Sequence, residues 1–295
     1  MVKLTIAIPA HNNSKHISEA IKSAQAQTYR KKEILVIDDC SQDNTVQIAK
    51  DLGVRVIVNE VNLGIGKNLE KFFDESLGGY LVFLCADDIF THPEVCNDIV
   101  QAFHQDLKIG VVGRYYYFFM DGHKGAIGVC RDKRILISSC CPSGMAFRKD
   151  KDLKVYGTNK IFIEMPFITM QYLVKYRWTM IEYDTIASRY APGVNTGTKK
   201  SYYTESPTQN WIDLIGENYQ DFPVFITLKN RAPKLLGREI YLHFQNDRSV
   251  IFKGKFWAFA LMALVIPSFV LKNLSSFYRH RIARRSARII ERKKD

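Results

Sequence analysis

The succession of strand-like and helix-like segments in the first third of the chain constrains the fold more than any other feature. Three short apolar runs, at residues 4–8, 34–37 and 80–84, have the length and composition of buried β-strands. Segments with apolar residues at the helical period separate these runs. Such an alternation predicts a parallel sheet covered by helices, and open sheets of this kind bind ligands at the carboxyl ends of their strands.

Each of these runs ends in a polar cluster, and the predicted architecture brings the three clusters to one edge of the sheet. They occupy residues 9–12, 38–41 and 85–88. Their four carboxylates are Asp38, Asp39, Asp87 and Asp88. Carboxylates gathered at one place need a cation, a sugar or a base to balance them. We therefore expect this edge of the sheet to bind a nucleotide sugar.

The last of the three clusters is suited to a divalent metal ion, because hard cations take oxygen ligands and bridge phosphates. Adjacent residues in an extended segment point in opposite directions, so only one of the two aspartates would coordinate the ion directly. We assign that role to Asp88, and Asp87 would reach the sugar or ribose hydroxyls. The alternative is a solvated turn of two aspartates that caps the next helix.

The other clusters offer groups for the nucleotide itself. The ring of His11 can stack on a base, and Asp39 can accept hydrogen bonds from a base or ribose. Asn62 begins a stretch in which Gly66 and Lys67 supply a flexible backbone and a cation at a helix start, which suits an anion. Its spacing is not that of a Walker loop. The alternatives are an exposed loop histidine and an aspartate cluster that only caps a helix.

Taken in order, these clusters resemble the N-terminal half of the family-2 inverting glycosyltransferases of the GT-A fold. The resemblance is strong over about residues 1–115, weaker to about residue 195 and absent beyond. The motifs that carry it are IAIPAHN at 6–12, QTY at 27–29, IDDCSxDxT at 37–45, NxGxGxN at 62–68 and ADD at 86–88. The resemblance implies an α/β fold with a Rossmann-like, mixed and mostly parallel sheet flanked by helices.

The resemblance also implies roles for the residues that match the motifs of this family. His11 takes the place of the residue that stacks on uracil, with Pro9, Ala10 and Asn12 beside it. Asp39 matches the carboxylate that reads the base. The implied donor is therefore a nucleotide sugar, most often a UDP-sugar.

The implied cofactor is Mn²⁺ or Mg²⁺, held by the DxD-type element of the family. Asp87 and Asp88 match that element, with Asp88 as the metal ligand. Ala86 stands where many relatives carry another acid, so the site depends more heavily on the last aspartate.

The catalytic base is the least regular part of the resemblance. Relatives often carry Glu-Asp at the start of a helix in the second half of the domain, and the matching stretch here is residues 162–167. Glu164 falls where the aspartate would be, so we assign it as the base that takes the proton from the acceptor hydroxyl. Its alternative role is to complement the helix dipole. Glu182 and Asp184 are the substitute candidates.

The basic charge of the chain is concentrated at its C-terminal end. The formal net charge is +12, and residues 246–295 contain twelve Lys and Arg against three Asp and Glu. Within them, residues 256–271 form an uncharged run of sixteen residues, which is shorter than the roughly 20 apolar residues of a spanning helix. An apolar run followed by a polybasic helix is typical of a segment in the membrane interface. The alternatives are a tilted or re-entrant insertion, a buried core helix and a nucleic-acid-binding arm.

We therefore expect a catalytic domain over residues 1–245 and a helical membrane-association region over residues 246–295. Six cysteines without CxxC spacing, and an N-terminus without a secretory signal, predict free thiols in a reduced compartment. In the middle of the chain, strand-like runs predict strands at residues 109–112, 114–120 and 178–183.

The sequence thus predicts a peripheral enzyme on the cytoplasmic face of the inner (plasma) membrane. It would transfer a single hexosyl or N-acetylhexosaminyl unit from a UDP-sugar to a lipid-linked or lipopolysaccharide-type glycan acceptor. An anionic membrane surface is the other expected partner, nucleic acid is not expected, and an oligomer is compatible with the sequence. The rival functions are a non-catalytic nucleotide-sugar-binding membrane adaptor and a sugar nucleotidyltransferase, although the Gly-rich phosphate loop of the latter is missing after the first strand.

Overall fold

The computed structural model describes residues 3–122, 125–126, 128–130, 141–159, 164–173 and 175–190 of the chain. Its helices are α1 (Ile17–Gln25), α2 (Thr45–Asp51), α3 (Ile65–Glu75), α4 (Val95–Gln105) and α6 (Glu164–Leu173). Its strands are β1 (Leu4–Ala10), β2 (Lys32–Asp38), β3 (Arg55–Val58), β4 (Tyr80–Phe83), β5 (Ile89–Phe90), β6 (Ile109–Phe119), β7 (Gly128–Cys130), β8 (Ala146–Arg148) and β9 (Arg177–Arg189).

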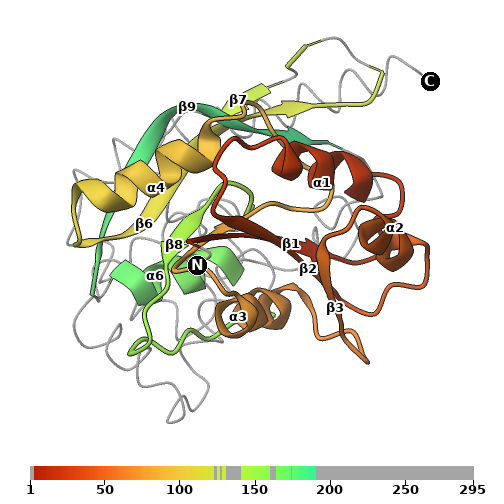
Figure 1. Ribbon diagram of the computed structural model, residues 1–295, viewed down its shortest axis with the longest axis horizontal. Helices are drawn as coiled ribbons and strands as arrows, with labels where there is room; N and C mark the ends of the chain where they lie inside the picture. Colours follow the sequence, from red (N-terminus) through yellow and green to blue (C-terminus); the bar gives the residue numbers. More distant parts are fainter. Residues whose placement is uncertain are drawn as a thin grey trace, which may run out of the picture.

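The strands form one mixed sheet in the order β3-β2-β1-β4-β8-β6-β9-β5, with β7 paired to β6 (Figure 1). The first four strands in this order run parallel, as the alternating sequence pattern predicts. Strand β8 is antiparallel to both of its neighbours and joins this half of the sheet to the parallel pair β6 and β9. The carboxyl ends of β2, β1 and β4 consequently lie at one edge of the sheet.

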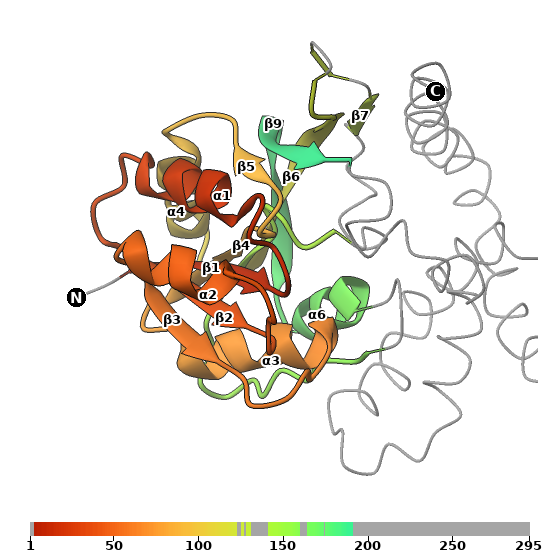
Figure 2. The ribbon, with the colours of Figure 1, turned by 90° about the vertical axis from the view of Figure 1, so that its right-hand side faces the viewer.

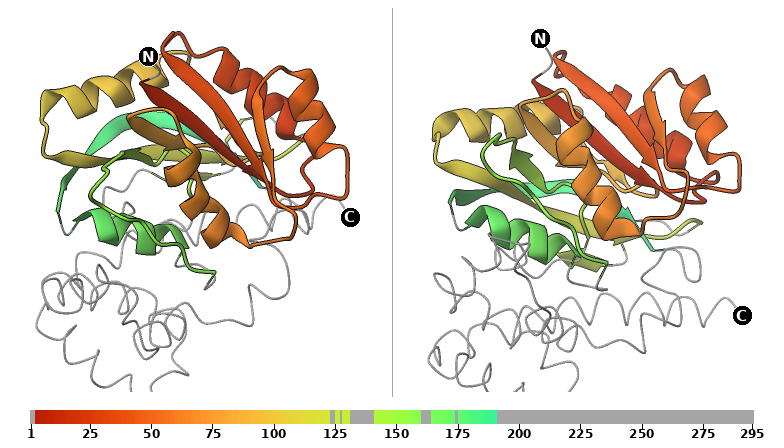
Figure 3. Two further views of the ribbon diagram at one scale, coloured as in Figure 1. Left: turned by 60° about the horizontal axis from the view of Figure 1, so that its bottom comes forward. Right: turned by 90° about the horizontal axis from the view of Figure 1, so that it is seen from below.

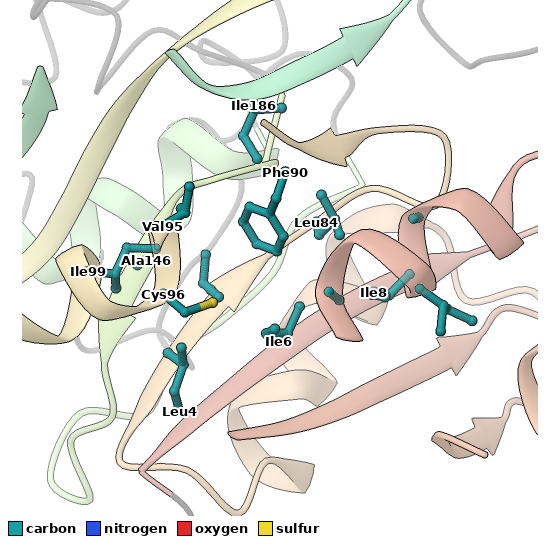
Figure 4. Close-up of a cluster of buried hydrophobic side chains, with 14 of the residues drawn as sticks. Leu4, Ile6, Ile8, Leu84, Phe90, Val95, Cys96, Ile99, Ala146 and Ile186 are labelled. Carbon is teal, nitrogen blue, oxygen red and sulfur yellow. The ribbon is translucent and has the colours of Figure 1, made fainter. Parts of the chain in front are cut away.

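Helices cover both faces of the sheet, with α1 and α4 on one face and α3 and α6 on the other (Figures 2 and 3). The side chains of β1 alternate between the two faces. Leu4, Ile6 and Ile8 belong to the apolar cluster beneath α1 and α4 (Figure 4), and Ala7 belongs to the cluster beneath α3 and α6. Because both faces are buried, the strand is an almost continuous apolar run.

The second half of the sheet differs in detail from the sequence prediction. The two strands predicted around residue 113 are a single strand, β6, which passes through Gly113 without a break. Strand β9 begins one residue before its predicted start and continues six residues past its predicted end, to Arg189. This extra length carries Arg189 to the predicted metal residues.

The predicted membrane-association region, residues 246–295, lies outside the described part of the chain. Among the described residues, no helix combines the length and the apolar character that crossing a membrane requires.

Candidate functional site at the carboxyl edge of the sheet

The loops that follow β1, β2 and β4 meet at the carboxyl edge of the sheet. Strand β1 lies between the other two, so that Ala10 is paired with Asp38 of β2 and Ala7 is paired with Phe83 of β4. Just beyond the last pair, the N–H of Asp39 donates to the carbonyl oxygen of Ala10 at 2.8 Å. The predicted nucleotide residues and the predicted metal residues therefore flank the end of one strand.

The carboxylate of Asp39, which is 4% exposed, holds the loop between β3 and α3. Its Oδ1 accepts hydrogen bonds from the N–H of Leu63 at 2.8 Å and from the side-chain amide of Asn59 at 2.9 Å. Its Oδ2 accepts a hydrogen bond from the N–H of Gly64 at 2.9 Å. Since a carboxylate has about four acceptor positions, one position on Oδ2 is left for a ligand among the contacts of the described residues.

His11 lies against the backbone of Asp39, with its Nδ1 at 2.8 Å from the carbonyl oxygen of Asp39. A carbonyl only accepts, so Nδ1 is the donor in this bond. Nε2 lies 3.1 Å from the side-chain nitrogen of Asn12. The side-chain nitrogen of Asn62 lies 3.4 Å from both ring nitrogens. Pro9, by contrast, is buried within β1. The structure therefore brings three of the predicted nucleotide-binding side chains, those of His11, Asn12 and Asn62, into contact beside Asp39.

The loops after β1 and β2 are cross-linked by polar side chains. The N–H of Asn12 donates to the hydroxyl of Ser41, and the side-chain oxygen of Asn12 accepts from the N–H of Gln42, both at 2.8 Å. Asp38 is fully buried and accepts hydrogen bonds from the N–H and the hydroxyl of Ser41. Asn12 and Cys40 both have positive φ angles, of 53° and 64°, which non-glycine residues seldom adopt outside functional or tightly held turns. Asp38 is shielded from solvent and shapes the loop, whereas Asp39 is the slightly exposed carboxylate of the two.

The start of α3 is closed by a segment from later in the chain. The N–H groups of Gly66 and Lys67 both point to the side-chain oxygen of Asn159, at 3.0 and 3.3 Å. Gly66 is buried, and a Cβ atom there would lie 1.7 Å from the carbonyl oxygen of Thr158. The ammonium group of Lys67 pairs with Glu70 at 2.8 Å. In this structure the donors that we expected to face an anion therefore have partners within the protein, and their role in nucleotide binding stays a prediction.

Asp87 and Asp88 occupy the turn between β4 and β5, and they differ in exposure. Asp87 is partly exposed, whereas Asp88 is only 2% exposed. Oδ1 of Asp88 accepts the N–H of Arg189 at 2.9 Å, and Oδ2 accepts the hydroxyl of Ser143 at 2.5 Å. The pairing of β5 with β9 brings Arg189 to this turn. The two carboxylates therefore have different surroundings.

Two cysteine thiols, which the sequence analysis left without a role, lie beside Asp88. The ligand atoms of Cys85, Asp88 and Cys141 all lie within 4.8 Å of one another. Burial, followed by the charges of Asp87 and Cys141, raises the pKa of Asp88 well above its ordinary value. A hydrogen bond from the Cys85 thiol and the nearby Arg114 guanidinium lower the pKa of Cys141 to about 6, against the effect of burial. Neighbours within this cluster therefore shift the pKa of Asp88 upward and that of Cys141 downward.

An oxygen-preferring cation such as Mg²⁺ or Mn²⁺ fits Asp87 better than Asp88. These ions select carboxylate, carbonyl and water oxygens and keep several waters of hydration. Asp88 is buried, its oxygens already accept two protein hydrogen bonds, and its neighbours are sulfur atoms. Asp87 is the carboxylate that solvent, and therefore a hydrated ion, can reach.

Arg189 is a site residue that the sequence analysis missed. Its side chain is 2% exposed and forms ion pairs with Glu19 of α1 and with Asp121. Its Nε donates to the carbonyl oxygen of Asp87 at 3.1 Å, and its guanidinium lies 4.5 Å from the ring centroid of Phe119. A single arginine at the end of a strand belongs to no motif. Only its burial next to the aspartates shows that it fixes the turn.

His16, at the start of α1, is a second residue without a sequence signal. Its ring is 3% exposed, and burial, followed by the charge of Arg189, lowers its pKa. The nearby carboxylate of Asp87 opposes that shift. The lowered pKa favours the neutral form of this imidazole, which lies near the turn that carries the two aspartates.

Glu164 stands at the beginning of the described part of α6 and is 5% exposed. Helix α6 packs against α3 and β6, and its residues from Glu164 to Tyr172 are all buried. Pro166 lies in the first turn, where the missing N–H of proline is not needed. The structure thus gives the predicted base a shielded position, and its catalytic role stays a prediction.

Comparison with known proteins gives one family and one fold. Residues 5–173, more than half of the chain, match the family described as Glycosyl transferase family 2. The poly(ribitol-phosphate) beta-N-acetylglucosaminyltransferase TarS of Staphylococcus aureus strain Mu50 is 30% identical over 128 residues, which are 39% of this chain and 22% of that protein. An uncharacterised glycosyltransferase of Haemophilus influenzae is 31% identical over 110 residues, or 37% of each chain. The chain thus spans less than two fifths of the length of these relatives.

Two solved structures resemble the chain over most of its length. The crystal structure of S. aureus TarS 1-349 in complex with UDP-GlcNAc has a TM-score of 0.65 at 20% identity and covers 86% of this chain and 76% of that one. The mannosyltransferase PcManGT from Pyrobaculum calidifontis, in complex with GDP-Man and Mn²⁺, has a TM-score of 0.55 at 15% identity. The match covers 97% of this chain and 87% of that one. At these identities the likeness shows the fold, which is GT-A, as the sequence predicts. Fold, motifs and family match agree that the chain belongs to glycosyl transferase family 2.

Proposed function

We propose that this chain is a cation-dependent inverting glycosyltransferase that moves a single sugar from a UDP-sugar to a hydroxyl group. The observation that carries the proposal is the arrangement around Asp39. A buried carboxylate, on which the described residues leave one acceptor position, stands beside the ring of His11 at the carboxyl end of β2. Ligands of open α/β sheets bind at this place.

The chemistry of this group suits a pyrimidine base. The imide N–H of uracil is a donor that the remaining position on Asp39 would accept, and the charge of the carboxylate strengthens such a bond. The hydrogen bond between Nδ1 of His11 and the Asp39 carbonyl fixes the ring in one orientation, which favours stacking on the base. The complex of TarS with UDP-GlcNAc supports uridine as the nucleoside and an N-acetylhexosamine as one candidate sugar.

The turn of Asp87 and Asp88 would receive the diphosphate end of the donor. Asp87 would hold the divalent cation, and Asp88 would brace the turn through its bonds to Ser143 and Arg189. When bound, the cation neutralises the charge of the departing nucleoside diphosphate. The complex of PcManGT with GDP-Man and Mn²⁺ supports Mn²⁺ or Mg²⁺ as this ion.

Transfer with inversion is a single displacement at the anomeric carbon, so one group must take the proton of the acceptor hydroxyl. Glu164 would take it. Its burial excludes water that would compete with the acceptor, and a position at a helix start favours the charged carboxylate that a base needs.

The nucleotide part of the proposal is tested by binding measurements with UDP, GDP, ADP and CMP, each with and without Mn²⁺, by isothermal titration calorimetry. We expect UDP to bind best, and Asp39→Asn to weaken UDP binding by about tenfold or more, because an amide offers one acceptor oxygen in place of two. One such bond to a charged group contributes roughly 1.5–3 kcal/mol.

The matched control is Asp51→Asn at the exposed end of α2, where the carboxylate accepts, within the described part of the chain, only the side chain of Gln47 in its own helix. This variant should bind UDP like the unmodified protein. Indifference of the unmodified chain to every nucleotide would refute the proposal.

We further propose that the acceptor is a lipid-linked or lipopolysaccharide-type glycan at the cytoplasmic face of the membrane. The support is the balance of twelve basic against three acidic residues in 246–295, next to the uncharged run 256–271. Each basic residue near an anionic surface adds about 1 kcal/mol of attraction.

The full chain should accordingly float with liposomes that contain an anionic lipid, and less so with neutral liposomes or at high salt. Equal flotation with both lipid compositions would argue against an electrostatic anchor. Tight, salt-sensitive binding of duplex DNA without any preference for anionic liposomes would instead favour a nucleic-acid-binding arm.

A further inference from the structure

Two thiols from different loops meet at the base of the turn that carries Asp87. Cys85 follows β4, and Cys141 lies in the segment that leads into β8. Their sulfur atoms are within 4.8 Å of each other, and the thiol of Cys85 donates a hydrogen bond to the sulfur of Cys141. We propose that Cys85 and Cys141 form a reversible disulfide, and that this bond lowers the affinity of the turn for the cation of the donor.

The two side chains point in directions that allow a bond between them. Cysteines whose side chains point apart cannot be bridged without a large movement of the backbone. Here both sulfurs converge on one place, because each lies within 4.8 Å of a carboxylate oxygen of Asp88 as well as of the other sulfur. A disulfide bond is about 2 Å long, so the two sulfurs must close by less than about 3 Å. Rotation of the two side chains draws the sulfurs together, and a shift of the two loops supplies any closure that is left.

Hydrogen bonds tie together the two loops that carry the thiols. The hydroxyl of Ser143, which is fully buried, accepts the N–H of Cys85 at 2.7 Å and donates to Oδ2 of Asp88 at 2.5 Å. The guanidinium of Arg114 donates to the carbonyl oxygen of Cys141 at 2.9 Å and to that of Ser143 at 2.5 Å. Because the folded chain already holds the thiols together, the second thiol is present at a high effective concentration when the first one reacts.

Both thiols can be reached by a small oxidant. Cys85 and Cys141 are partly exposed, whereas Cys96 is buried. The oxidant is a low-molecular-weight disulfide such as glutathione disulfide. One cysteine attacks it as the thiolate, forms a mixed disulfide and releases one glutathione, and the second cysteine then attacks the sulfur of the first and releases the other glutathione. In total the protein loses two electrons and two protons, and the oxidant is reduced to two molecules of glutathione.

The disulfide would act on the turn that carries the proposed cation ligand. Cys85 precedes Asp87 by two positions, and Sγ of Cys141 lies 3.8 Å from Oδ2 of Asp88. Formation of the bond pulls on the start of the turn and leaves the sulfur of Cys141 without a proton to donate to Asp88. Loss of the groups that orient a metal ligand typically lowers the affinity for the metal by roughly 10–100-fold. The effect on cation binding rests on the function proposed above, whereas the formation of the disulfide does not.

The bond itself is tested on the full chain, reduced with dithiothreitol and then equilibrated with glutathione disulfide. Mass spectrometry of an unreduced tryptic digest should show the peptide of Cys85 linked to the peptide of Cys141, and dithiothreitol should separate them. Cys85→Ser and Cys141→Ser should each abolish the link. Cys96 shares the tryptic peptide of Cys85 and should not replace it, because it is buried. The matched controls are Cys40→Ser, in the loop after β2, and Cys140→Ser, next to Cys141 in sequence, and both should keep the link.

The effect on the turn is measured as the affinity for Mn²⁺ in the presence of UDP, by calorimetry of the reduced and the oxidised chain. We expect oxidation to weaken Mn²⁺ binding by roughly 10–100-fold and to raise the Mn²⁺ concentration needed for half-maximal activity in the same proportion. Dithiothreitol should restore both quantities. In Cys141→Ser, which cannot form the bond, glutathione disulfide should leave both quantities unchanged. Circular dichroism checks that each variant is folded.

Three results would overturn this inference. The first is an oxidised chain in which Cys85 and Cys141 remain free or carry separate glutathione adducts. The second is a link that survives in Cys141→Ser and is lost in Cys140→Ser, which would give the bond to Cys140. The third is a Cys85–Cys141 link that forms and leaves the affinity for Mn²⁺ unchanged. A chain that forms the link but binds neither UDP nor Mn²⁺ in its reduced state would instead refute the function proposed above, so the two failures can be told apart.

Discussion

Replacement of Glu164 by glutamine is expected to lower the turnover number by about 10²–10⁴-fold, the usual contribution of a general base. Glutamine keeps the shape and the hydrogen-bonding capacity of the side chain, but it cannot take the proton from the acceptor hydroxyl. Because Glu164 lies on α6 and the proposed nucleotide group lies on the loops after β1 and β2, UDP binding should be unchanged. Steady-state kinetics with a UDP-sugar, together with calorimetry of UDP binding, measure both quantities.

The matched control is Glu182→Gln, the same substitution on an exposed residue of β9. It should turn over donor like the unmodified enzyme. If Glu182→Gln loses activity and Glu164→Gln keeps it, the base is Glu182. A chain that binds UDP but transfers no sugar to any acceptor tested would favour the non-catalytic adaptor.

Replacement of Asp87 by asparagine should raise the Mn²⁺ concentration needed for half-maximal activity more than any other single change at this turn. The loss of a direct ligand should weaken metal binding by more than the roughly 10–100-fold that the loss of a residue supporting a ligand typically causes. The neutral amide keeps one oxygen but loses the charge that attracts the ion. Activity measured as a function of Mn²⁺ concentration, in buffer without other divalent metal ions, gives the change in the concentration needed for half-maximal activity.

Asp88→Asn is the comparison variant for this measurement. Its amide can still accept the N–H of Arg189 and can donate to the hydroxyl of Ser143, so the turn should be preserved. We expect a smaller shift in the Mn²⁺ requirement than for Asp87→Asn. The reverse order would show that Asp88 is the direct ligand, as the sequence motif suggests.

The parallel half of the sheet was predictable because its signals are local. The apolar run of β1 and the helical period of α1 each lie within ten residues of sequence, and both faces of the sheet demand apolar side chains. The polar ends of β1, β2 and β4 followed from the same pattern, since parallel strands end at one edge. The proximity of His11 and Asp39 follows from this pattern.

The residues that the sequence analysis missed act across long separations in the chain. Arg189 reaches Asp88 across 101 positions, and Asn159 reaches Gly66 across 93. Neither residue belongs to a motif. The pairing of β9 with β5 brings Arg189 to its partner, and the packing of a late segment on α3 brings Asn159 to its partner. Gly66 was assigned to ligand binding, whereas in the fold its missing side chain admits the backbone of Thr158.

The sequence alone determined the order of strands and helices in the first half of the chain, the edge at which its polar loops meet and the family to which it belongs. These follow from periodicities of two and 3.6 residues and from short motifs, which need no knowledge of distant contacts. Only the tertiary structure decided which aspartate is accessible, which is buried against Ser143, and that two cysteines 56 positions apart stand beside it. The burial of these side chains and their contacts arise from loops that the sheet brings together. No local sequence pattern predicts which of these loops come into contact.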